Sequence, residues 1–271
     1  LTTIGSFAFD GCTALTDITL PDSLEELGTG VFRHAESLET INFPALIIAI
    51  PNVTFQYCLS LKSVVIPATV SEIGHSAFSY CYGLDSLRIE GDITTIGGSV
   101  FFNCYNLTSI YYNSSIGGDV GDENYIFYNA GSSTEGVTLT LGTNAVIPNK
   151  LFDPVFDENK PLITAVAFED GQTTITSIYS DGLPYLESIT IPDSVTTIEP
   201  DAFTGCEGAL YNEYGITYAD GWAIFCDKEA TTITIRDGIR GIANGVFDSC
   251  TDAFSLTIPE NFSNLTAEDF A

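Results

Sequence analysis

The amino-acid sequence predicts a solenoid, a fold in which similar turns of the chain stack along one axis. Three observations predict it: apolar residues return with a period of 23 residues, each period carries a phenylalanine at the same place, and each ends in a short strand-like run. Successive periods begin at Leu1, Leu24, Ile47, Val70 and Ile93. A fixed period of this length is typical of repeat proteins, whose single units cannot bury their own apolar face.

Three positions define each period. The first is an aliphatic residue, at Ile4, Leu27, Ile50, Ile73 and Ile96. The second, five residues later, is Phe9, Phe32, Phe55, Phe78 and Phe101. The third, three residues further on, is Cys12, Ala35, Cys58, Cys81 and Cys104. We expect the phenylalanine and cysteine positions to lie on an arc that folds back over the strand and buries it.

The strand-like run has the pattern L-x-x-I-x-L, as in Leu15-Ile18-Leu20 and Leu84-Leu87-Ile89. Further strand ends follow at 139–141, 166–168, 189–191, 233–235 and 256–258, and the long step before the fourth of them leaves room for one more strand near Tyr211 to Ile216. Stacked at about 4.8 Å per strand, these runs would form one parallel sheet of about 10 to 11 short strands.

We expect one domain over residues 1–271. Its parts are regular units at 1–115, irregular units at 116–174, units at 175–210, a β-hairpin insertion at 211–226 and units at 227–271, the last truncated. Asp220-Gly221 between alternating runs predicts the hairpin turn. The tail Phe262, Leu265, Phe270 begins a unit that the chain does not finish, so we expect a fragment of a longer protein. We also expect this fragment to be monomeric.

Charge and composition exclude several classes of protein. The net charge is −28, so the chain would repel nucleic acid and anionic membrane surfaces. Hydrophobic residues make up 45%, which predicts a folded protein, and no run approaches the roughly 20 apolar residues of a membrane helix. The seven cysteines are odd in number and lack a C-x-x-C pair, which predicts neither a disulfide framework nor a zinc site.

The repeat, I-x-x-x-A-F-x-x-C-x-x-L-x-x-I-x-I-P-x-x-V-x-x-I, resembles the BspA-like leucine-rich repeats, most clearly over Ile73–Ile89 and Ile198–Cys206. The resemblance implies a right-handed, curved leucine-rich repeat solenoid with a concave parallel sheet and short helical or irregular segments on the convex side. It also implies bacterial secreted or cell-surface proteins that act in adhesion and in binding host or partner molecules.

The first candidate binding surface is the outer face of the sheet. Its outward positions are mostly serine and threonine, but Val65, Arg88 and Tyr111 break the column on consecutive strands and could form a contact patch. The alternative is purely architectural, because half-exposed strands favour threonine.

The second candidate is the hairpin, where Tyr214, Tyr218 and Trp222 could form a projecting aromatic edge for sugar or protein contact. Similar hairpins recur in the resembled family, which favours a spacer instead. The third candidate is the irregular region, with Tyr125, Phe127 and Tyr128, since long loops on regular scaffolds often carry function.

Other chemistry receives little support. Asp119, Asp122 and Glu123 form a weak calcium candidate, as does Asp153 to Glu158, although a solvated acidic loop explains both. The stacked cysteines are interpreted as core packing, because neighbouring turns give poor disulfide geometry, and Cys226 as another core residue. His34 and His75 are expected on the surface of the arcs. We therefore expect no enzyme and no cofactor.

With what the resemblance implies, we expect an extracellular adhesion module that binds host or neighbouring-cell proteins through the solenoid surface. Its partners would be extracellular proteins or cell-surface glycans. Two alternatives stay open, a carbohydrate-binding module that uses aromatic loops and a passive spacer that displays other domains.

Overall fold

The structure is a computed structural model that describes residues 1–115, 125–147, 151–152, 162–176, 178, 183, 185–248, 250–253 and 255–260. The chain separates into two compact units, Leu1–Val166 and Ala167–Ala271, and each is described by itself. The single domain expected over 1–271 stays a prediction.

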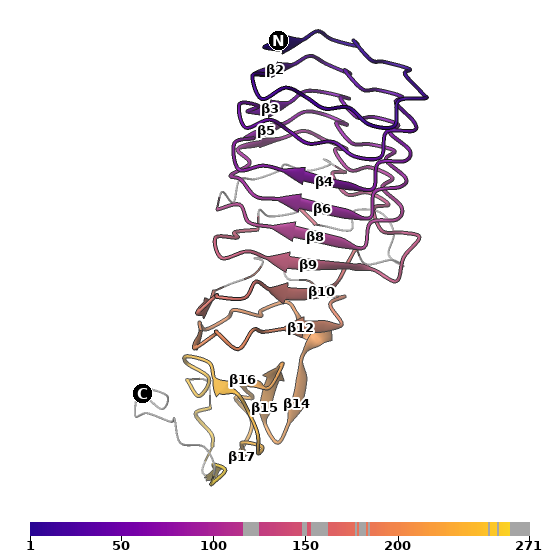
Figure 1. Ribbon diagram of the computed structural model, residues 1–271. Helices are drawn as coiled ribbons and strands as arrows, with labels where there is room; N and C mark the ends of the chain where they lie inside the picture. Colours follow the sequence, from indigo (N-terminus) through magenta and orange to yellow (C-terminus); the bar gives the residue numbers. More distant parts are fainter. Residues whose placement is uncertain are drawn as a thin grey trace. The chain divides into compact units, whose positions relative to one another are not determined.

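The first unit is a stack of parallel coils, as the period predicts (Figure 1). Its main sheet contains β4 (Ser63–Ile66), β6 (Ser86–Ile89), β8 (Ser109–Tyr112), β9 (Val137–Leu141) and β10 (Ile163–Phe168), which continues past the boundary at Val166. Ser63, Ser86, Ser109 and Thr138 lie side by side in register, so equivalent positions of successive repeats form straight columns. The inward members of each strand are buried, for example Val64 and Ile66. The solenoid predicted from the sequence is confirmed.

A second ladder of parallel strands runs along the stack. It consists of two-residue strands, β1 (Thr3–Ile4), β2 (Glu26–Leu27), β3 (Ala49–Ile50), β5 (Glu72–Ile73) and β7 (Thr95–Ile96). β1 pairs with β2, and β3, β5 and β7 pair in order. Each strand ends on the recurring aliphatic residue. Among the described residues the one helical element is the 3-10 turn η1 (Glu207–Ala209), so the segments outside the main sheet are turns and short strands rather than helices.

The arc between the second ladder and the main sheet has an alternating backbone. Ser76 and Tyr80 have positive φ angles of 55° and 62°, and the equivalent residues of the neighbouring turns repeat this conformation. The Phe78 N–H donates to the Val100 carbonyl of the next turn, whereas the Cys81 N–H donates back to the Phe78 carbonyl within its own turn. The amides from Ser76 to Cys81 thus donate alternately to carbonyls of the neighbouring turn and of their own turn.

The core is built from two columns that the sequence predicts. The recurring phenylalanines stack with ring centroids 5.0 to 5.4 Å apart, in the order Phe9, Phe32, Phe55, Phe78, Phe101 and Phe127. The buried thiols of Cys58, Cys81 and Cys104 donate to the carbonyls of Phe32, Phe55 and Phe78. All three cysteines are unpaired, and a buried Ala35 occupies the same column. The packing interpretation is confirmed.

The second unit begins with short parallel elements and continues into an antiparallel sheet. β11 (Thr174–Ile175) pairs with β13 (Thr197–Ile198), and β12 (Ser188–Thr190) lies between them in sequence. β17 (Thr232–Thr234) pairs in parallel with β19 (Ser255–Thr257).

The predicted hairpin exists. β15 (Ile216–Ala219) and β16 (Trp222–Cys226) are antiparallel and joined by Asp220-Gly221, whose φ angles are 42° and 83°. β14 (Tyr211–Glu213) pairs antiparallel with β15, so the extra strand expected near Tyr211 is present but belongs to a three-stranded meander. The meander also pairs with a short strand later in the chain: β18 (Gly241–Ile242) runs parallel to β16 and is hydrogen-bonded to it.

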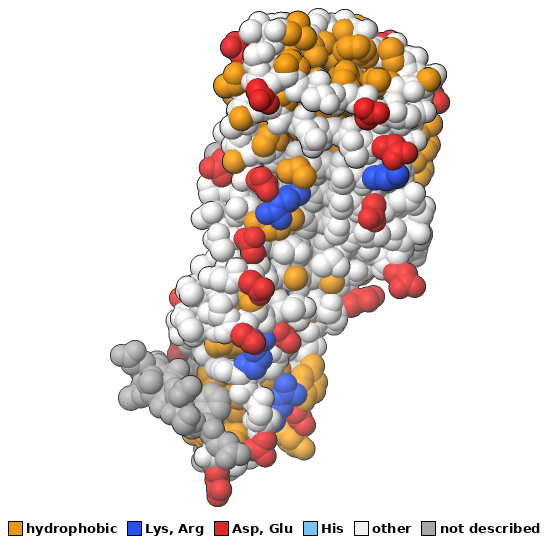
Figure 2. Space-filling view, in the orientation of Figure 1, with side chains coloured by type: hydrophobic (Ala, Val, Ile, Leu, Met, Phe, Trp, Pro, Cys, Tyr) orange, Lys and Arg blue, Asp and Glu red, His pale blue; other side chains and the backbone are white. Residues whose placement is uncertain are grey.

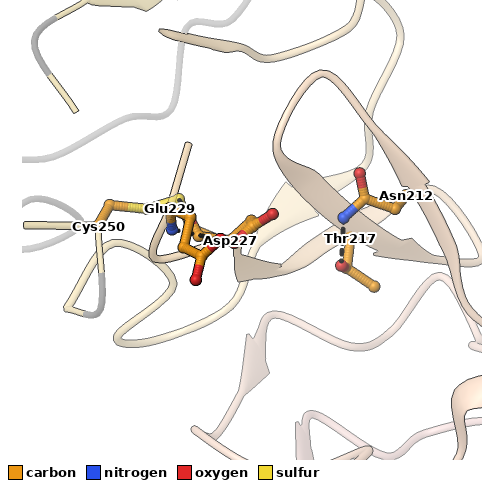
Figure 3. The surroundings of a disulfide bond; sticks show 6 residues. Asn212, Thr217, Asp227, Glu229 and Cys250 are labelled. Atoms are coloured by element: carbon orange, nitrogen blue, oxygen red, sulfur yellow. Dashed lines mark hydrogen bonds between the residues drawn. A yellow bond between two sulfur atoms is a disulfide. The ribbon is translucent and has the colours of Figure 1, made fainter. Parts of the chain in front are cut away.

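The interpretation of Cys226 as a core residue alone is wrong. Cys226 forms a disulfide with Cys250, with Cα atoms 6.1 Å apart (Figure 3). The geometric objection to a bridge applies to thiols at equivalent positions in successive turns. Cys226 lies on β16 instead, so its side chain approaches that of Cys250 from a different element.

Candidate functional site

The three outward residues predicted as a patch lie next to one another on the main sheet. Val65 of β4 faces Arg88 of β6, and Arg88 faces Tyr111 of β8. Val65 is 46% exposed, and the other two side chains are half-buried. The adjacency follows from the 23-residue period, because it places the same strand position of each repeat in one column.

Contacts within this patch hold the guanidinium of Arg88 in place. Its central carbon lies 3.4 Å from the centroid of the Tyr111 ring, and Nε donates to Oε1 of Glu90 at 2.6 Å. The planar group is thus stacked on one face and paired at one edge, and arginine and tyrosine in such settings are frequent interface anchors. Ser63, Ser86 and Ser109 form a flat column two residues before the patch. Ligand binding here remains a prediction.

The predicted projecting edge of the hairpin is wrong for two of its three residues. Tyr214 is 66% exposed, but Tyr218 is only 2% and Trp222 only 5% exposed. The Arg236 guanidinium lies 4.7 Å from the centroid of the Tyr218 ring, and the backbone N–H of Arg236 donates to the Tyr218 hydroxyl. The Trp222 ring packs where a side chain at Gly241 would otherwise stand. The hairpin therefore turns these aromatic groups inward.

An aromatic column on the arc was missed by the sequence interpretation. His34 stacks on Tyr57 and Tyr57 on Tyr80, with ring centroids 4.6 and 4.5 Å apart, and a neighbouring pair continues with Phe102 on Tyr128 at 5.0 Å. All five side chains are half-buried. Packing against its neighbours desolvates the Tyr57 hydroxyl and raises its pKa. The readable signal was the 23-residue spacing of positions 34, 57 and 80.

These stacked rings turn their faces toward one another. Sugars bind aromatic side chains through exposed ring faces, so this column is a poor platform for a glycan. Phe127, named as a candidate in the irregular region, is buried on Phe101 and belongs to the core column.

The other candidate sites are placed as follows. Asp119, Asp122 and Glu123 lie outside the described residues, as does Asp153 to Glu158. Within the described ranges, no group of three potential metal-binding side chains comes together. His34 and His75 both lie on arcs, and the His75 Nδ1 is 2.8 Å from the hydroxyl oxygen of Ser76, whose side chain is buried. In the part of the chain that is described, no helix is long and apolar enough to cross a membrane.

Comparison with known families agrees with this repeat architecture. The family model described as "BspA type Leucine rich repeat region" matches six copies over residues 2–134 and 173–271. The chain belongs to the BspA-type leucine-rich repeat family. BspA-type repeats form a scaffold of the protein-interaction kind, since an extended array offers a long contact surface.

The chain is also similar to solved bacterial structures, among them the following three. A leucine-rich repeat protein of T. pallidum is 24% identical with a TM-score of 0.49, covering 58% of this chain and 71% of that one. One from Bacteroides ovatus is 18% identical with a TM-score of 0.44, covering 97% and 83%. A leucine-rich cell surface protein of Faecalibacterium prausnitzii is 21% identical with a TM-score of 0.31, covering 95% and 69%. No curated protein matches the chain.

Proposed function

We propose that this BspA-type repeat chain is a cell-surface adhesion module that binds an extracellular protein through the outer face of β4, β6 and β8. The observation that supports the proposal most is the patch of Val65, Arg88 and Tyr111, where the arginine is held by Tyr111 and Glu90 before any partner arrives. A side chain that is already ordered loses little entropy on binding. The surface location follows the expectation for the family.

The charge of the chain suggests what kind of partner it meets. With 8 basic and 36 acidic residues, its field attracts basic surfaces and speeds their encounter. On the face seen in Figure 2, the basic side chains stand as separate groups close to carboxylates. The partner of this acidic module is therefore a protein with a basic patch.

The test is label-free binding of the full chain to a panel of extracellular-matrix proteins and glycans at low and moderate salt. The variants Arg88→Thr and Tyr111→Thr return the patch to the hydroxyl column around it. We expect each to weaken protein binding by about tenfold or more. Arg33→Ala is the matched control, because Arg33 is also half-buried and ion-paired, with Asp10, but lies on the arc.

The outcomes separate the competing functions. Saturable protein binding that falls in the two patch variants and not in the control supports adhesion through the sheet. Binding to glycans alone would favour the carbohydrate-binding alternative. An absence of binding across the panel would contradict the proposal and favour a spacer.

A further inference from the structure

A cavity of 460 Å³ lies in the second unit, between the arc that follows β13 and one face of the meander. The meander contributes a cross-strand row, in which Asn212 of β14 faces Thr217 of β15 and Thr217 faces Phe225 of β16. The arc contributes Glu199 and Asp201. The cavity shares no residue with the sheet patch.

One wall of the cavity is apolar and partly open to solvent. Phe225 is 51% exposed, although it lies on a strand whose neighbours Ala223 and Cys226 are buried. Leu210 and Ile224 extend this wall and are half-buried. An exposed phenylalanine at the mouth of a cavity offers a face for an apolar or planar cationic group.

Polar residues line the cavity on both the arc and the meander. Glu199 and Asp201 supply carboxylates, and Oε1 of Glu199 is 3.4 Å from Nδ2 of Asn244, which orients it. The amide of Asn212 already donates to the Thr217 hydroxyl, as Figure 3 shows. Asp201 stands at an arc position where the first unit has Ser76, and its φ of 63° matches the turn. These polar residues together favour a ligand that donates hydrogen bonds.

The two arginines of this unit are engaged elsewhere. Of the described residues that line the cavity, none is basic. Arg240 pairs with Asp193 and Asp220 at 3.0 and 2.9 Å, and Arg236 lies over Tyr211 and Tyr218. Glu199 and Asp201 therefore line a cavity to which no basic residue among its described lining contributes.

We infer that this cavity binds an arginine side chain of a partner protein. The guanidinium has five donors and no acceptor, matches a carboxylate in a bidentate pair and stacks on an aromatic face, whereas its aliphatic stem packs on apolar surface. Glu199 and Asp201 would take the head group, and Phe225 with Leu210 would take the stem. The inference rests on the proposed function only in that the ligand is part of a protein.

The test is calorimetric titration of the full chain with acetyl-Gly-Arg-Gly-amide and with the same peptide carrying citrulline. Citrulline keeps the shape of arginine but is neutral. We expect saturable binding of the arginine peptide and an affinity for the citrulline peptide that is lower by about tenfold or more. The affinity for the arginine peptide should fall by about fivefold or more in each of the variants Glu199→Gln, Asp201→Asn and Phe225→Ala.

Two control variants make the result specific. Asp237→Asn removes the same charge at an exposed position away from the cavity and should leave the affinity unchanged. The Arg88→Thr, Tyr111→Thr double variant should also leave it unchanged, so failure of the sheet proposal and failure of this one are told apart. Should Phe225→Ala not fold, the two carboxylate variants still decide.

Four outcomes would overturn the inference. They are equal binding of the citrulline peptide, an equal effect of Asp237→Asn, absence of saturable binding at millimolar peptide, and binding of a neutral methyl glycoside in place of the arginine peptide. The last result would assign the cavity to a sugar.

Discussion

The guanidinium carbon of Arg88 lies 3.4 Å from the centre of the Tyr111 ring on the neighbouring strand. Strand pairing places these residues directly opposite each other, and Glu90 holds the other edge of the guanidinium. The pair converts two flexible side chains into one flat, ordered surface in a field of small hydroxyl residues.

This relationship predicts a measurable coupling between Arg88 and Tyr111. In a double-mutant cycle with Arg88→Thr and Tyr111→Thr, urea unfolding should give a coupling free energy of about 0.5 to 1 kcal/mol, because the pair is half-exposed. Tyr111→Phe keeps the ring face, so a cycle with this variant should show that most of the coupling free energy is retained. Additive effects of the two single variants would contradict the stacking.

The phenylalanine column predicts where the first unit is most sensitive. Phe78 is fully buried between Phe55 and Phe101, at 5.1 and 5.4 Å. Phe78→Ala leaves a cavity that rigid neighbouring turns cannot close, so unfolding should cost about 3 to 5 kcal/mol less. The control is Phe7→Ala, since Phe7 is 45% exposed, and it should change stability far less. Urea unfolding measures both variants. If the free energy of unfolding fell equally in Phe78→Ala and Phe7→Ala, burial would not explain the sensitivity of this column.

Much of the fold is predictable from the sequence because one period controls it. The spacing of Phe9, Phe32 and Phe55 fixes which residue of each turn lies over the next, and this register also places Val65 beside Arg88. The second ladder was harder to predict, because a two-residue strand such as Glu72–Ile73 is too short to show an alternating pattern.

The predictions that were wrong, for the hairpin aromatic residues and for Cys226, concern contacts between elements of different type. Alternation predicts the strands around Asp220-Gly221, but not that Arg236 covers Tyr218 or that Gly241 leaves room for the Trp222 ring. The disulfide of Cys226 depends in the same way on the meander approaching a coil. A repeat pattern therefore predicts neither the packing of the hairpin aromatic residues nor the disulfide.

The buried thiols predict a loss of stability at alkaline pH. Burial raises the pKa of Cys58 and Cys104 to about 12, from an ordinary value of 9.0. Because the folded pKa is raised, the protonated thiol contributes stability that is fully present below pH 9.0 and is lost as the pH rises toward 12.

Urea unfolding between pH 8 and pH 11 checks this expectation. Each such thiol should lower the free energy of unfolding by up to about 1.4 kcal/mol per pH unit above the unfolded pKa. Cys58→Ala places in this column the residue already found at Ala35 and should flatten the decline by about that amount. An unchanged slope in Cys58→Ala would show that other groups, such as Tyr112, control the alkaline transition.

The disulfide predicts a redox dependence confined to the second unit. Cys226 and Cys250 are separated by 24 residues, and closing a loop of that length stabilises the folded state by about 3 kcal/mol. Trp222, the one tryptophan, lies on the strand that carries Cys226, so its fluorescence reports unfolding of this unit. A reductant should therefore lower the thermal midpoint seen by Trp222. The Cys226→Ser, Cys250→Ser double variant should melt at the lower midpoint with or without reductant. If the unmodified chain melts identically in both conditions, the bridge does not stabilise this unit.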